Sequence, residues 1–191
     1  MLEQEVKMLL SSCEYNLLVC RFSDTVSIRQ VNYYFDTYDY KWHRNRVTCR
    51  IREKTGNFVA TIKSHVNKSV GVSIERSQQV QDECDTSFFE DMNICYQGKL
   101  VTERLCIMLA DDIEVAIDRN VYLGMVDYEI EIEHLTDCAS ISQEHVAMLL
   151  TEYLVQLTEL PRSEVEKRMS SCLSKSERFF LRKIMLQSSG S

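Results

Sequence analysis

The sequence has few residues that interrupt regular structure and no long apolar run. It contains one proline and five glycines in 191 residues, and no repeat or low-complexity stretch that would indicate a linker. No segment approaches about 18 consecutive apolar residues, and the N-terminus has no basic segment followed by an apolar run and a cleavage site. We therefore expect a cytoplasmic protein that does not enter the membrane. A single domain is expected over residues 1–187, with a flexible tail over residues 188–191.

Cysteine pairs, histidine clusters and excess positive charge are also absent. The eight cysteines are scattered, without a C-x-x-C pair, and the four histidines show no zinc-ligand spacing. The scattered cysteines predict reduced thiols that fill apolar space, and neither the cysteines nor the histidines predict a zinc site. A formal net charge of −7 argues against non-specific binding to DNA, because affinity for the phosphate backbone needs a basic surface. A local basic pocket is still compatible with this charge.

The sequence does contain segments in which apolar and polar residues alternate with a period of two, as is typical of β-strands. In the first segment Glu3, Glu5 and Lys7 alternate mainly with apolar residues, and later segments repeat this division into an ionised and an apolar face. The eight predicted strands span residues 2–8, 32–37, 47–52, 58–63, 70–76, 100–107, 113–118 and 128–133. The predicted helices span residues 9–21, 86–96, 142–157, 163–169 and 174–185.

Two arrangements are compatible with an ionised strand face. An open sheet can turn this face toward water, which is the more common arrangement. A sheet closed into a barrel can instead turn it inward around a wet tunnel, where a mixture of acids and bases avoids repulsion. The nearly all-ionised face is the observation that points to the second arrangement, an α+β fold: an antiparallel, eight-stranded closed β-barrel with helices packed on the outside. A triphosphate with a divalent metal ion would balance such a tunnel, since Arg and Lys bind phosphate oxygens and carboxylates bind hard cations.

Motifs along nearly the whole chain resemble those of the CYTH, or triphosphate tunnel metalloenzyme, superfamily. Residues 3–7, Glu-x-Glu-x-Lys, resemble its E-x-E-x-K signature, and residues 50–52, Arg-Ile-Arg, resemble its R-x-R strand. The chain resembles in particular the small CYTH proteins of Gram-positive bacteria that are often labelled adenylate cyclases. Other matching positions, in the family's order, are 32–37, 61–63, 118, 127–131 and 175–179.

The resemblance implies roles for many of the charged residues on the ionised face, and for Lys175 near the end of the chain. The expected ligands of Mg2+ or Mn2+ are Glu3, Glu5, Glu75, Asp118, Glu129 and Glu131. The expected phosphate-binding residues are Lys7, Arg50, Arg52, Lys63, Arg104 and Lys175. The residues expected to act in catalysis are Glu3, Glu5, Lys7, Arg50 and Arg52. The alternative is an exposed strand face with ordinary cross-strand ion pairs, each contributing about 0.2–1 kcal/mol.

Three functions stay open for a protein with these motifs. We expect a divalent-metal-dependent triphosphatase that hydrolyses inorganic or small organic triphosphates, because the motifs provide phosphate and metal binding without a recognisable base-recognition element. One alternative is a class IV-type adenylate cyclase, and another is a noncatalytic sensor that binds nucleotides or polyphosphate. The expected partner is a triphosphate-containing small molecule, and both a monomer and a homodimer fit the sequence.

Overall fold

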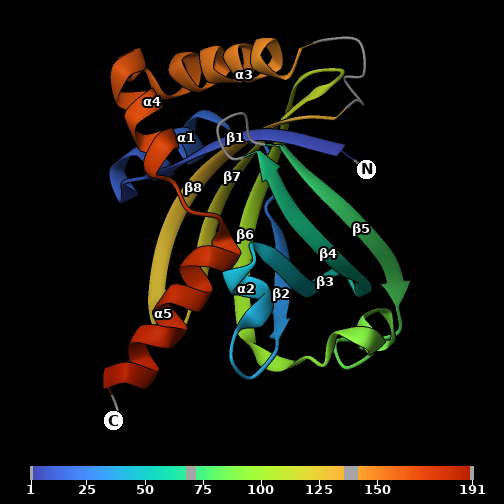
Figure 1. The fold of residues 1–191 in the computed structure, drawn as a ribbon. Helices are drawn as coiled ribbons and strands as arrows, with labels where there is room; N and C mark the ends of the chain where they lie inside the picture. The colour runs from blue at the N-terminus through green and yellow to red at the C-terminus, as the bar shows by residue number, and fades with distance from the viewer. Residues whose placement is uncertain (1, 68–71, 136–141, 190–191) are drawn as a thin grey trace.

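The protein folds into a closed barrel of eight antiparallel strands. The computed structural model describes residues 2–67, 72–135 and 142–189, without the side chains of residues 2, 3 and 65–67. The order around the barrel is β1-β5-β4-β3-β2-β6-β7-β8 (Figure 1). The closed barrel and its eight strands confirm the predicted fold, although residues 70 and 71 of the fifth predicted strand lie outside the described residues. The strands are β1 (Leu2–Leu10), β2 (Ile28–Asp36), β3 (Val47–Lys54), β4 (Asn57–Asn67), β5 (Val72–Val80), β6 (Cys95–Ala110), β7 (Ile113–Tyr122) and β8 (Met125–His134).

The apolar faces of β1, β7 and β8 point outward and are covered by three helices. These are α1 (Ser12–Arg21), α3 (Gln143–Thr158) and α4 (Arg162–Ser171), and Figure 1 shows them together at one side of the barrel. Met8 and Leu150 are both fully buried in the core between strands and helices. Ser142, the first residue of the helix predicted over 142–157, is the N-cap of α3, since its hydroxyl accepts a hydrogen bond of 3.2 Å from the backbone N–H of His145.

Two predicted helices include residues that belong to strands in the structure. The segment predicted as a helix over 9–21 begins as strand, because β1 continues to Leu10, which is buried in the core. Helix α1 then begins at Ser12, after a capping box formed by Ser11 and Glu14. The helix predicted over 86–96 is shortened to a 3-10 helix, η1 (Ser87–Met92), because β6 already begins at Cys95.

A short helix, α2 (Lys41–Arg44), lies between the second and third predicted strands, where no helix was predicted. The buried carboxylate of Asp36, at the end of β2, accepts hydrogen bonds from the backbone N–H groups of Trp42 (2.9 Å) and His43 (2.7 Å). It therefore satisfies donors that the first turn of a helix leaves without partners. Four residues are too few to show a helical period in the sequence.

The last helix, α5 (Lys175–Ser189), differs from the prediction that the helices pack on the outside. Its first turns lie against the inner wall: the ring of Phe179, fully buried, lies 4.8 Å from that of Tyr34, which pairs with Arg50 on the inner face. Gly98 makes this approach possible, because a Cβ at that position would be 2.8 Å from Phe179 Cζ and its φ is +137°. Figure 1 shows α5 in front of β7 and β8.

The C-terminal end of α5 includes part of the expected tail. The helix continues through Ser188 and Ser189, while residues 190 and 191 lie outside the described part of the chain. Among the helices that the structure describes, none has the length and apolar character needed to cross a membrane.

Candidate active site

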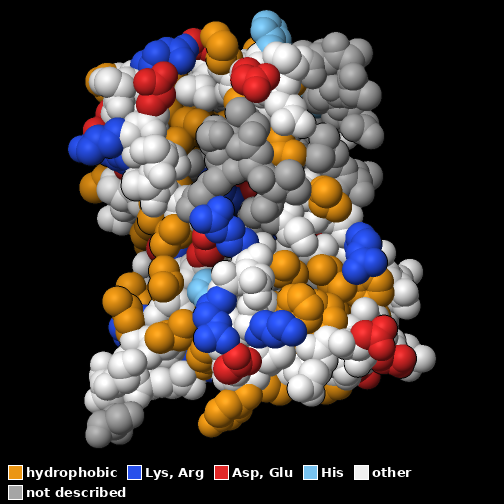
Figure 2. Space-filling view, viewed as in Figure 1, with side chains coloured by type: hydrophobic (Ala, Val, Ile, Leu, Met, Phe, Trp, Pro, Cys, Tyr) orange, Lys and Arg blue, Asp and Glu red, His pale blue; other side chains and the backbone are white. Residues whose placement is uncertain are grey.

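A polar cavity lies inside the barrel and contains most of the predicted site residues. Nine of the twelve line it; of the other three, Asp118 and Glu129 are fully buried, and the side chain of Glu3 lies outside the described part. Figure 2 shows basic and acidic side chains side by side in a hollow near the middle of one face. The lining residues are Glu5, Lys7, Tyr34, Thr48, Arg50, Arg52, Lys63, Glu75, Arg104, Glu131, Glu133, Ser174, Lys175 and Ser176.

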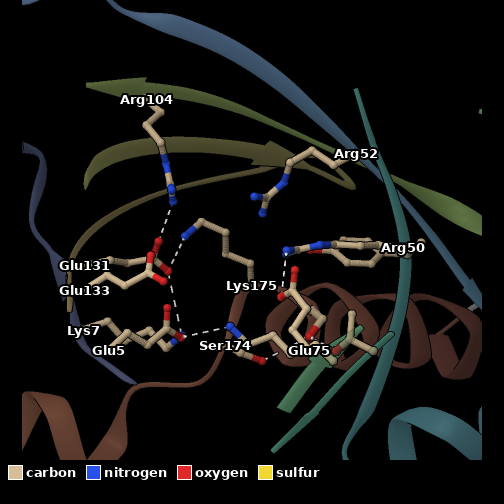
Figure 3. Close-up of a pocket in the computed structure, with 14 residues that line it drawn as sticks. Glu5, Lys7, Arg50, Arg52, Glu75, Arg104, Glu131, Glu133, Ser174 and Lys175 are labelled. Carbon is tan, nitrogen blue, oxygen red and sulfur yellow. Dashed lines mark hydrogen bonds and ion pairs between the residues drawn. The ribbon is translucent and has the colours of Figure 1, made fainter. Parts of the chain in front are cut away.

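The strand register explains why these residues meet. Glu5 lies opposite Glu133, and Lys7 opposite Glu131, on paired strands β1 and β8. Since alternate residues of a strand face opposite sides, the same register that turns these charges inward turns the apolar residues between them outward. Figure 3 shows the glutamates of β1 and β8 on one side of the cavity and two arginines of β3 on the other.

On the acidic side, ion pairs hold Glu5 in its charged form. Its Oε1 lies 2.5 Å from Lys7 Nζ and 3.7 Å from Lys63 Nζ. Burial on its own would raise the pKa of Glu5, but Lys63 and Lys7 outweigh this effect and lower its pKa to about 2. The carboxylate is therefore ionised at neutral pH, as a ligand of a hard cation must be.

On the opposite side, Arg50 and Arg52 form an arginine pair with few acidic partners among the side chains that the structure describes. Arg52 Nε donates to the neutral amide oxygen of Asn32 at 2.9 Å, and Arg50 Nη2 lies 3.7 Å from Glu75 Oε2. Among the described residues, Arg50 Nε has no hydrogen-bond partner. Burial and the positive charges of Arg50 and Arg104 lower the pKa of Arg52 to about 10. Such a pair is suited to bind an anion with several oxygens, such as a phosphate group.

Asp118, Glu129 and Glu131 form a compact acidic cluster, in which one oxygen of each lies within 4.8 Å of the others. Arg104 bonds to both oxygens of Asp118, at 2.8 and 2.6 Å, and Lys175 Nζ reaches all three residues. The metal-binding role of Asp118 and Glu129 stays a prediction. In this structure the oxygens of both residues accept hydrogen bonds from cationic side chains.

Several lining residues were not among the predicted site residues. Glu133 could have been found, since it has the same strand parity as Glu129 and Glu131. Ser174 and Ser176 could not, because only the entry of α5 into the barrel brings them there. The hydroxyl of Ser176 is 2.7 Å from that of Thr48 on β3, so α5 is joined directly to the strand that carries the arginine pair.

Comparisons with known proteins agree with this architecture. A curated relative from Bacillus subtilis (strain 168), "Putative triphosphatase YjbK", is 27% identical over 154 residues, 73% of this chain and 76% of the relative. A Bacillus halodurans structure named "putative adenylate cyclase" has a TM-score of 0.70 at 24% identity, with 93% of this chain and 97% of that chain covered. A Hippeastrum structure, named "Putative adenylyl cyclase HpAC1" and described as having a dominant triphosphatase activity, has a TM-score of 0.67 at 20% identity; the match covers 93% of this chain and 94% of that chain.

The family itself is identified by a match to the chain's own sequence. The model of the CYTH domain matches residues 1–164, which include all eight strands of the barrel and the acidic and basic walls of the cavity. The chain therefore belongs to the CYTH domain family.

Proposed function

We propose that this protein is a metal-dependent triphosphatase that hydrolyses a small triphosphate inside its barrel. The observation that carries the proposal is that one cavity has the glutamates of β1 and β8 on one side and the Arg50–Arg52 pair on the other (Figure 3). A phosphate chain is attracted to the Arg50–Arg52 pair, and its metal ion to the carboxylates opposite. The names of the relatives YjbK and HpAC1 support the same activity.

The residues present fit a divalent metal ion such as Mg2+ or Mn2+. Glu5, Glu131 and Glu133 line the cavity and offer the hard oxygen ligands that these ions prefer. Glu3 precedes Glu5 by two residues on β1, and Glu75 lines the same cavity, so both extend the proposed ligand set. When bound, the metal would supply charge neutralisation on the phosphate oxygens and acidify a water molecule.

The chain's own contribution to the reaction is to bind and orient the phosphates. Arg50, Arg52 and Lys63 neutralise the phosphate oxygens, and Arg104, fixed by Asp118, keeps its guanidinium at the cavity wall. Phosphoryl transfer gains most from such charge neutralisation and from alignment of the nucleophile. Water attacks the terminal phosphorus, and the bond between this phosphorus and the bridging oxygen breaks. No covalent intermediate with the protein is needed.

Phosphate release from three substrates tests the proposal. Purified protein is incubated with tripolyphosphate, ATP or thiamine triphosphate, each with Mg2+, with Mn2+, or with EDTA. We expect phosphate release from at least one substrate and none with EDTA. Cyclic AMP formed from ATP would instead support the cyclase, and tight triphosphate binding without any product would support a sensor. Either result, without phosphate release, contradicts the proposed hydrolase.

A further inference from the structure

The acidic cluster of Asp118, Glu129 and Glu131 already holds a cation that belongs to the chain. The Nζ atom of Lys175 lies 2.7 Å from Glu131 Oε1 and 2.9 Å from both Asp118 Oδ2 and Glu129 Oε2. These are hydrogen-bond distances to three carboxylates that otherwise have the composition of a metal site. The ammonium group therefore stands at the position that a metal ion in this cluster would take.

The remaining oxygens of the cluster are also occupied. Asp118 Oδ1 accepts from Arg104 Nε at 2.8 Å, and Glu131 Oε2 accepts from Arg104 Nη2 at 2.5 Å. Glu129 Oε1 accepts from Arg178 Nη1 at 3.4 Å. Each of the six oxygens thus has a donor from one of three cationic side chains, and a fourth, Lys7, lies 3.8 Å from Glu131 Oε1. A metal ion could bind here only by displacing at least one of these cations.

Arg178 fixes Lys175 in this place. It lies one helical turn after Lys175 on α5 and bonds to Glu129 Oε2 at 2.7 Å and to Asp127 Oδ2 at 2.9 Å. The same guanidinium donates to the carbonyl of Leu173, at 2.5 Å, just before the helix begins. Arg178 therefore joins the first turn of α5 both to β8 and to the segment before the helix. This fixes the backbone of Lys175, whose side chain points into the cluster.

We infer that Lys175 is the resident cation of the Asp118–Glu129–Glu131 cluster and excludes divalent metal from it. This rests on the proposed function in assuming a metal-dependent enzyme. It removes Glu131 from the ligand set proposed above and confines the metal to the other carboxylates of the cavity, on the side of Glu5 and Glu133. Asp118 and Glu129 are then positioning residues: they hold the ammonium of Lys175 at the cavity wall, between the glutamates and the arginine pair (Figure 3). Displacing the ammonium would leave a charge that is only 9% exposed without its partners.

Binding of Mn2+ in the absence of any triphosphate tests the inference. The number of Mn2+ ions bound per full-length chain is measured by titration with electron paramagnetic resonance. The proteins compared are the wild type, Lys175→Gln, the double variant Lys175→Gln with Asp118→Asn, and Lys183→Gln. Lys183 is the matched control, because it lies on the same helix and bonds to Gln97, outside the cluster.

We expect Lys175→Gln to bind one Mn2+ more per chain than the wild type, and the double variant and Lys183→Gln to match the wild type. Equal binding by Lys175→Gln and the wild type overturns the inference. Should Lys175→Gln fail to fold, wild-type crystals soaked in Mn2+ decide: an anomalous peak between Asp118 and Glu129 overturns the inference, and a cluster still filled by Lys175 supports it. Phosphate release is measured separately, so an inactive protein with the expected Mn2+ count contradicts the proposed function alone.

Discussion

Replacing Arg178 by methionine should destabilise the fold far more than the loss of an ordinary ion pair. Its side chain is 8% exposed and bonds to Asp127 and Glu129, and Glu129 is fully buried. The variant leaves these charges under-compensated, and breaking a buried pair in this way costs about 3–5 kcal/mol. We expect a loss of this size in the free energy of unfolding, measured by urea denaturation and circular dichroism.

Arg168→Met is the matched control. Arg168 also bonds to two carboxylates, those of Glu14 (3.0 Å) and Glu164 (2.8 Å), but its side chain is 30% exposed, so the expected loss is at most about 1 kcal/mol. Adding Glu129→Gln to Arg178→Met should restore part of the stability, because it removes a buried charge. Equal losses for the two arginine variants would refute the argument that burial makes the Arg178 contacts important.

Three further predictions concern the cavity. Glu5→Gln should lower kcat for phosphate release at least about 100-fold, since it removes a proposed ligand of the metal. The variant should still be folded at pH 7 and unfold cooperatively in urea. The pKa of Glu5 is about 2 in the folded state, and its ordinary value is 4.5. Its stabilising effect is therefore present above pH 4.5 and is lost as the pH falls toward 2. Over this pH range the melting temperature should fall more steeply for the wild type than for Glu5→Gln. Gly98→Ala should lower the melting temperature and reduce phosphate release together, because its Cβ would meet Phe179 at 2.8 Å and push α5 from the inner wall; an unchanged melting temperature would contradict this.

The strand faces were predictable because alternation fixes which side of a sheet each residue faces. Glu5, Lys7, Arg50 and Arg52 all line the cavity as their parity indicated. Parity does not give depth, however. Glu129 has the same parity as Glu131, yet it is fully buried while Glu131 lines the cavity. The difference depends on which side chains cover each residue, and those come from a distant part of the chain.

The placement of α5 could not be predicted from its own sequence. A helical period shows which residues share a face of the helix, but it does not show whether that face meets the outside or the inside of a barrel. Lys175 was given a phosphate-binding role through the family resemblance. The roles of Arg178 and Phe179 could not be predicted, because they depend on a helix that enters the barrel. In the sequence the signal was the glycine at position 98 itself; the structure shows its reason, because a φ of +137° and the close approach of Phe179 leave no room for a side chain.

The arginine pair has a consequence for how this protein's ligand can be found. Two like charges held side by side raise the energy of the ligand-free protein, and an anion that neutralises them raises the melting temperature, by more at a higher concentration or a tighter affinity. Candidate compounds can therefore be ranked by thermal shift, without any turnover. A compound that stabilises the wild type and loses this effect in Arg52→Met identifies itself as a ligand of the cavity.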